Sequence, residues 1–88
     1  MIGLVGLGRM GGAMLGRLRD QGQDVAAFDQ DAGLRARAGG VPGLADCAAP
    51  VVILSLPHEA AVEAVLAGLL PAIPKGGVVV DTSTIAPG

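Results

Sequence analysis

The 88-residue sequence has few of the side chains that carry most protein chemistry. Cys47 is the single cysteine, which excludes a disulfide framework and a cysteine-based metal site. His58 and Lys75 are the single histidine and lysine, and Phe28 is the single aromatic residue. Six basic and eight acidic residues give a formal net charge of −2. Without a basic patch or a series of aromatic residues, we do not expect a nucleic-acid partner.

Long hydrophobic runs are also absent. No apolar run approaches the roughly 18 residues that a membrane span needs. The first expected strand begins at Ile2, which leaves no room for a signal or transit peptide. We therefore expect a cytoplasmic protein with no membrane partner. The chain is nevertheless 51% hydrophobic, almost entirely aliphatic, a composition that suits one small domain around a parallel sheet buried on both faces.

Short apolar runs alternate with segments of helical periodicity. The expected strands are 2–7, 24–29, 41–42, 51–56 and 78–81. The expected helices are 10–21, a short one capped by Asp31 and ending at 38, a single turn at 44–48, and 58–70. Strands that alternate with helices predict an α/β fold with a doubly wound parallel sheet of about five strands in the order 3-2-1-4-5. Because Pro42 cannot donate a hydrogen bond, the third strand is expected as a short edge.

The first expected strand runs into a cluster of glycines. Residues 6–11, GLGRMG, match the pattern G-x-G-x-x-G between a strand and a helix. In a Rossmann-type sheet Gly6 allows a tight turn, Gly8 lets the backbone approach a pyrophosphate, and Gly11 lets the helix pack close to the strand. The pattern alone is weak in a chain with 15 glycines, so its context decides the interpretation.

An acidic residue supplies that context. Asp29 ends the second expected strand, 18 residues after Gly11, close to the roughly 20 expected for the acid that holds a ribose 2′-hydroxyl. Asp29 alone fits a helix cap or turn former equally well, but with the glycines it predicts dinucleotide binding. A carboxylate there opposes a 2′-phosphate, so NAD is the expected cofactor. NADP stays open because Arg35 or Arg37 could supply a cation.

Three stretches carry a resemblance to a known family. GLVGLGRMGGAM, LSLP and DTSTIAP resemble, in this order, the β-hydroxyacid dehydrogenases, such as 3-hydroxyisobutyrate dehydrogenase and tartronate semialdehyde reductase, relatives of 6-phosphogluconate dehydrogenase. The likeness runs from Met1 to Gly88. It implies an oxidoreductase that transfers a hydride between a nicotinamide cofactor and a small β-hydroxyacid substrate, and a homo-oligomeric complete enzyme.

The resemblance also implies roles for individual residues. Leu56 and Pro57 would line the cofactor cleft, Thr84 would contact the cofactor near the nicotinamide, and Ser83 would help to shape the substrate pocket. Asp29 would hold the adenosine ribose. The pyrophosphate would lie on the backbone of Gly6, Leu7, Gly8, Arg9, Met10 and Gly11. No catalytic residue and no metal ligand is implied within these residues.

The sequence departs from the family in several places. The segment 30–50 is short for the family, and Gln30 replaces an arginine often found after the ribose-binding acid. The family's glycine-rich substrate loop and its helical domain with the catalytic lysine have no counterpart here. We therefore interpret residues 1–88 as the N-terminal part of an NAD(P)-binding domain and predict that they are inactive alone. A standalone dinucleotide-binding module without chemistry, or a truncated inactive fragment, is the alternative.

Overall fold

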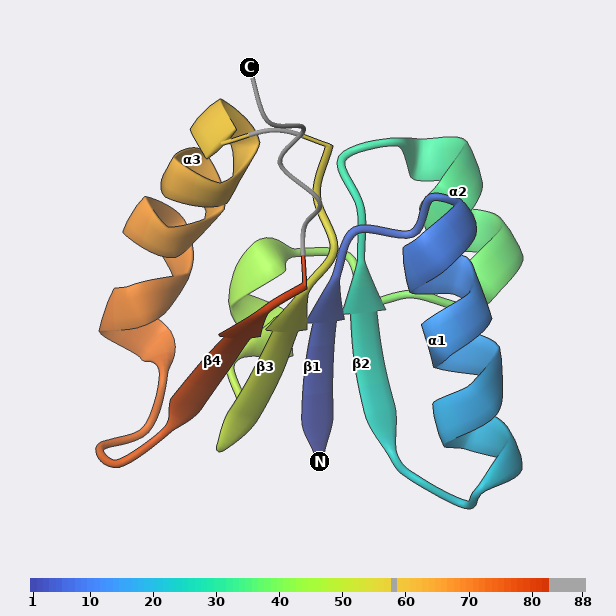
Figure 1. The fold of residues 1–88 in the computed structure, drawn as a ribbon, viewed down its shortest axis with the longest axis horizontal. Helices are drawn as coiled ribbons and strands as arrows, with labels where there is room; N and C mark the ends of the chain where they lie inside the picture. The colour runs from blue at the N-terminus through green and yellow to red at the C-terminus, as the bar shows by residue number, and fades with distance from the viewer. Residues whose placement is uncertain (58, 83–88) are drawn as a thin grey trace.

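The fold is a parallel sheet with helices on both faces, and the computed structural model describes residues 1–57 and 59–82. All paired strands are parallel, and the order of the sheet is β2-β1-β3-β4 (Figure 1). The strands are β1 (Ile2–Val5), β2 (Val25–Phe28), β3 (Val51–Leu54) and β4 (Val78–Asp81). The predicted α/β class and parallel sheet are confirmed.

Helices connect the strands. In Figure 1, α1 and α2 lie beside β2, whereas α3 lies at the other end of the sheet, beside β4. No helix in the described part of the chain is long and apolar enough to cross a membrane. The α-helices are α1 (Arg9–Asp20), α2 (Ala32–Ala38) and α3 (Glu59–Leu69), and the 3-10 turns are η1 (Leu44–Cys47) and η2 (Leu70–Ala72).

Local sequence signals set the helix ends. The Asp31 carboxylate accepts hydrogen bonds from the N–H groups of Gly33 and Leu34 at 2.8 and 3.1 Å, which caps α2 as predicted. Gly22 follows α1 with a φ of 80°, a left-handed conformation that closes the helix end. The chain therefore enters β2 and leaves it at positions fixed by a few residues.

Two hydrophobic clusters divide the core between the faces of the sheet, because alternate strand residues point to opposite sides. Leu4 and Ala27 pack with α1 and α2, whereas Val5, Val52 and Leu54 pack with α3 and η1. The second cluster also includes the fully buried Cys47. A small sheet covered on both faces holds the carboxyl ends of β1, β2 and β3 close together, where the sequence predicts a ligand.

The expected third strand at 41–42 is wrong. Val41 donates one hydrogen bond to the Ala27 carbonyl, at 2.8 Å, so the chain begins to pair with β2. Pro42 has no N–H to continue the ladder. The next residue, Gly43, instead donates to the Asp46 carboxylate at 3.1 Å, where η1 begins. The sheet therefore has four strands in place of about five. Their order, β2-β1-β3-β4, is the predicted order 3-2-1-4-5 without its third strand.

One end of the sheet is less covered than the other. On β4, Val78 and Val80 are 54% and 42% exposed, and Val51 on the adjoining strand is 38% exposed. The register pairs Val51 with Val78, so these side chains form a continuous apolar strip. The carboxyl ends beside β1 are the better enclosed part of the fold.

Candidate functional site

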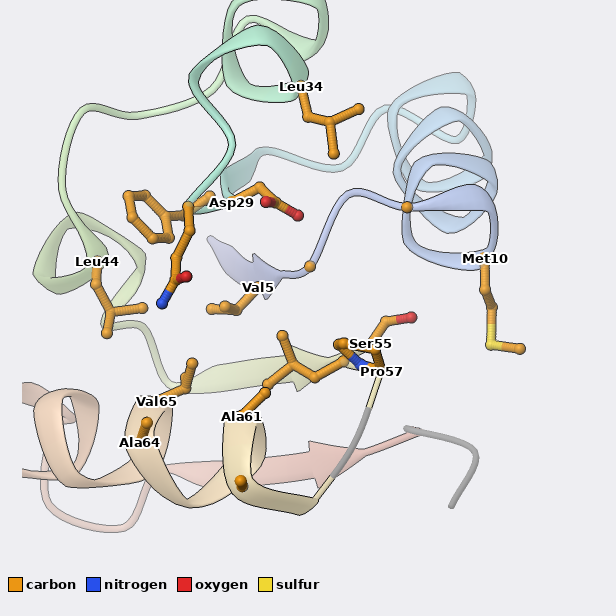
Figure 2. A pocket seen from close by; sticks show the side chains of 16 residues that line it. Val5, Met10, Asp29, Leu34, Leu44, Ser55, Pro57, Ala61, Ala64 and Val65 are labelled. Carbon is orange, nitrogen blue, oxygen red and sulfur yellow. The ribbon is translucent and has the colours of Figure 1, made fainter. Parts of the chain in front are cut away.

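A cleft of about 750 Å³ opens at the carboxyl ends of β1, β2 and β3. This volume is in the range of small-molecule sites. Figure 2 shows the lining side chains, which come from β1, β2 and the turns after β1, β2 and β3, and from α1, α2, η1 and one side of α3. The lining residues are Val5, Gly6, Gly8, Met10, Phe28, Asp29, Gln30, Leu34, Leu44, Ser55, Leu56, Pro57, Ala60, Ala61, Ala64 and Val65.

Two glycines of the turn after β1 are required by the fold itself. Gly6 has a φ of 103°, and a Cβ there would overlap the carbonyl oxygen of Ser55. A Cβ at Gly11 would overlap the carbonyl oxygen of Gly6. Both residues let three backbone segments meet without side chains between them, so their roles in the turn and in helix packing agree with the sequence pattern.

Gly8 has no such internal reason. No heavy atom lies within 4 Å of a Cβ placed on Gly8, and its φ of −67° is accessible to any residue. Gly8 lines the cleft, so the open space beside it is space that a ligand can enter. Of the three glycines of the pattern, Gly8 is therefore the one that neither a close backbone contact nor a positive φ requires.

The N-terminus of α1 points to the same place. Gly8 is the N-cap residue and makes no side-chain cap, and the first turn contains no acidic residue. The first hydrogen bond of the helix runs from the Gly12 N–H to the Gly8 carbonyl, at 2.7 Å. The preceding N–H groups and the positive end of the helix dipole favour an anion such as a phosphate at this position.

The Asp29 carboxylate links the turn after β1 to the turn after β2 by hydrogen bonds. One carboxylate oxygen accepts a hydrogen bond from the Leu7 N–H and the other from the Asp31 N–H, both at 2.8 Å. A carboxylate has about four acceptor positions, so two remain for further donors. The vicinal hydroxyls of a ribose are donors of the right kind and spacing. Asp29 is thus both a support of the glycine-rich turn and a candidate ribose ligand.

A cation lies close to Asp29. The Arg35 guanidinium donates to the Asp29 main-chain oxygen at 3.2 Å and lies over the Phe28 ring, 5.3 Å from its centroid. Arg37 instead donates to the Gly33 carbonyl at 3.3 Å, on its own helix. Of the two arginines considered from the sequence, Arg35 is the one bonded to the residue that would hold the ribose.

The opposite wall is apolar. Leu56 and Pro57 follow β3, and small side chains from α3 continue this wall (Figure 2). Ala61 and Ala64 lie on the side of α3 that lines the cleft, and Val65 is buried beneath them. An apolar wall of this kind suits a flat ring such as adenine, and none of the described side chains that form it carries a charge.

The structure places the predicted residues in three groups. Gly6, Gly8, Met10, Asp29, Leu56 and Pro57 line the cleft. Leu7, Arg9 and Gly11 belong to the same turn and helix start but do not line it, so any contact from Leu7 or Gly11 is through the backbone. Ser83 and Thr84 lie outside the described residues. All of these binding roles stay predictions.

Sequence reasoning missed several cleft residues. Ser55 lies near the end of the predicted strand 51–56 and directly after the observed β3, so its hydroxyl could have been noted at a strand end. Ala64 follows Ala61 and Ala60 at helical spacing, a pattern of small residues that could have indicated an open helix face. Phe28 and Leu44 have no sequence signal that separates a cleft wall from the core.

Catalytic groups are scarce near the cleft. Cys47 is fully buried, donates weakly to the Ala26 carbonyl at 3.3 Å, and burial raises the pKa of its thiol to about 11. Lys75 lies in the loop before β4, at the amino edge of the sheet, opposite the cleft. Within residues 1–57 and 59–82, no group of three or more His, Cys, Asp or Glu side chains is placed to hold a metal ion. The site can bind and orient a ligand, and Asp29 is the one titratable side chain among the described residues that line it.

Comparison with known families agrees with this geometry. The family profile of the NAD binding domain of 6-phosphogluconate dehydrogenase matches residues 1–88. No curated protein gives a significant match.

Solved structures give closer detail. The chain is similar to 3-hydroxyisobutyrate dehydrogenase from Mycobacterium tuberculosis, solved with L-serine, with 31% identity and a TM-score of 0.89 over 96% of this chain and 31% of that one. An imine reductase from Streptomyces aurantiacus has 29% identity and a TM-score of 0.80, over 93% of this chain and 31% of that one. A reductive aminase from Aspergillus terreus, solved with NADPH and ethyl-5-oxohexanoate, has 26% identity and a TM-score of 0.77, over 94% and 31%. The chain thus spans about a third of the length of these proteins.

Proposed function

The chain belongs to the family of the NAD binding domain of 6-phosphogluconate dehydrogenase, and from this premise we propose that it holds the cofactor of an enzyme that oxidises a small β-hydroxyacid. The similarity to 3-hydroxyisobutyrate dehydrogenase supports this proposal, over about a third of the length of that protein. Residues 1–88 would be the N-terminal part of the NAD(P)-binding domain, with the rest of the domain and a helical domain beyond it.

The observation that carries the proposal is the open space at Gly8. The backbone from Gly6 to Gly11 would hold the pyrophosphate against the start of α1, and Asp29 would hold the adenosine ribose through its two remaining acceptor positions. Leu56 and Pro57 would contact the adenosine side of the cofactor. When bound, the nicotinamide ring supplies the hydride chemistry, and these residues orient it.

We propose NAD as the preferred cofactor. The Asp29 carboxylate lies where a 2′-phosphate would have to enter, and a phosphate cannot donate hydrogen bonds to it. Arg35 is the opposing influence, but its guanidinium is held by the Asp29 carbonyl and the Phe28 ring. The Arg35 side chain would have to reorient before its guanidinium could contact a 2′-phosphate.

A dinucleotide-binding module without chemistry is the second candidate for residues 1–88 themselves. Hydride transfer needs a base within about 3 Å of the substrate hydroxyl. Lys75 is at the far edge of the sheet, so no lysine reaches the cleft from the described residues. We therefore expect cofactor binding without turnover from this chain. Separately, we propose that the protein is located in the cytoplasm.

The test is a titration of the 88-residue chain with NADH, followed by a turnover assay. The chain has no Trp or Tyr, so cofactor fluorescence can be followed without protein emission in the same range. Gly8→Val is the control, because valine fits the backbone yet fills the ligand space. We expect saturable binding to the native chain, at least tenfold weaker binding to Gly8→Val, and no oxidation of β-hydroxyacids. Equal NADH binding by both proteins would contradict the cofactor site. Turnover by the native chain that Gly8→Val abolishes would contradict the prediction that residues 1–88 are inactive alone.

A further inference from the structure

Ser55 is a polar residue of the cleft that the glycine pattern and the ribose acid leave unexplained. It follows β3 directly, lines the cleft, and is partly buried. Its main-chain oxygen makes the close approach to Gly6 that excludes a side chain there. Its position is therefore fixed by the backbone of two adjoining strands and does not depend on a flexible loop.

The hydroxyl of Ser55 has no protein partner within residues 1–57 and 59–82. The strand next to it provides a contrast. The Thr82 hydroxyl, at the end of β4, donates to the Leu54 carbonyl at 2.8 Å and so completes the sheet edge. The hydroxyls of Ser55 and Thr82, at neighbouring strand ends, therefore differ in role. The Thr82 hydroxyl stabilises the fold, whereas the Ser55 hydroxyl is available to a ligand.

The direction of the side chain indicates which part of a ligand it would meet. Ser55 lines the cleft, and in Figure 2 its oxygen is directed toward the side on which Met10 lies, away from Asp29 and Leu34. A Cβ on Gly11 would lie 3.5 Å from the Ser55 Cβ, so the side chain is also adjacent to the first turn of α1. The hydroxyl lies beyond the adenosine end of the cleft, next to the phosphate-binding turn.

We propose that Ser55 binds the half of the cofactor distal to adenosine, donating a hydrogen bond to an oxygen of the second phosphate or of the ribose attached to it. This inference rests on the proposed function, since it presumes a dinucleotide in the cleft. The hydroxyl extends the set of N–H donors at the start of α1 by one side-chain donor supplied from β3. Ser55 would thereby fix the nicotinamide half relative to the sheet.

The experiment compares ligands that do and do not reach Ser55. The native chain, Ser55→Ala and Thr82→Val are titrated with NADH, ADP-ribose and AMP, and folding is checked by far-UV circular dichroism. For Ser55→Ala we expect affinity about fivefold to tenfold lower for NADH and ADP-ribose, as for a hydrogen bond to a polar or charged oxygen, and unchanged for AMP. For Thr82→Val we expect lower resistance to urea with the ratio of the NADH and AMP affinities unchanged.

Each outcome has one meaning. Unchanged NADH affinity in Ser55→Ala overturns the role of Ser55 and leaves the cofactor site intact. An equal loss for AMP and NADH also overturns it, because a distal contact cannot affect AMP. Absence of NADH binding to the native chain overturns the proposed function itself. Ser55→Cys, which keeps the size of the side chain but donates weakly, should behave as Ser55→Ala does.

Discussion

The turn from β1 to α1 and the turn from β3 to α3 line the same cleft with different chemistry. The first presents glycines, free N–H groups and a helix N-terminus. The second presents Leu56 and Pro57, followed by small apolar residues on α3. Both are strand-to-helix connections of one parallel sheet, so topology alone does not distinguish them. The parallel sheet therefore determines where the cleft lies, whereas the composition of each turn determines which kind of chemical group it can accept.

A methyl group added to the first turn should have the strongest effect of the substitutions considered for the two turns. Gly11→Ala would place its Cβ on the Gly6 carbonyl oxygen, a backbone atom that cannot move without displacing the turn. We expect a loss of about 3 kcal/mol in the free energy of unfolding, a large fraction of the stability of a small domain. Urea unfolding followed by circular dichroism measures it.

A second glycine on the same helix is the matched control. No heavy atom lies within 4 Å of a Cβ on Gly16, which is exposed. Gly16→Ala should therefore stabilise the chain by about 0.5–1 kcal/mol through helix propensity. An equal loss of stability in Gly11→Ala and Gly16→Ala would contradict the claim that Gly11 is needed for the close approach of α1 to Gly6.

The charge at the end of β2 gives the next largest expected effect. Asp29→Asn replaces a carboxylate that can accept four hydrogen bonds by an amide that both donates and accepts. We expect NADH affinity to fall about tenfold or more, the equivalent of about 1.5–3 kcal/mol for bonds to a charged group, and NADPH affinity to stay level or rise. Calorimetric titration with both cofactors measures the change in preference.

Asp31→Asn removes a charge of the same sign two residues away and keeps a good helix cap. It should leave the ratio of NADH to NADPH affinity close to that of the native chain. An equal change of this affinity ratio in Asp29→Asn and Asp31→Asn would contradict the ribose contact of Asp29. The net charge of the region would then set the cofactor preference.

The smallest expected effect belongs to the second turn. Ala64→Leu puts a larger side chain into the apolar wall, where an adenine ring is expected to lie. Affinity for AMP and NADH should fall about fivefold, or about 1 kcal/mol, with stability nearly unchanged. Ala67→Leu is on the same helix but does not line the cleft, so it should change neither quantity. Reduced stability in Ala64→Leu with unchanged AMP affinity would place adenine elsewhere.

These two turns also mark how far sequence could predict the structure. Gly6, Gly8 and Asp29 belong to one sequence pattern with a characteristic spacing between a strand, a helix and a second strand, so their place at the cleft was predictable. The failed strand at 41–42 shows the limit, since Val41 does make one sheet hydrogen bond to Ala27 before Pro42 ends the pairing. Propensity could not decide between an edge strand and the start of η1.

The cleft lining was less predictable than the fold. Ser55 and Ala64 lie far along the chain from residues 6–11, and they face the same space only because β3 pairs beside β1 and α3 packs over the sheet. Phe28 and Leu44 are aliphatic or aromatic residues whose sequence pattern is that of core residues. Which apolar side chains border a cavity depends on tertiary packing, which local periodicity does not contain.

The two backbone hydrogen bonds that Asp29 accepts have a consequence for rates. They hold the N–H groups of Leu7 and Asp31 in place before any ligand arrives, so the glycine-rich turn need not be ordered during binding. A dinucleotide would then meet a receptor that is already in its docking shape, so complex formation would not wait for this turn to rearrange. The entropic cost of arranging this part of the site falls on the folding of the chain and not on each encounter with a cofactor.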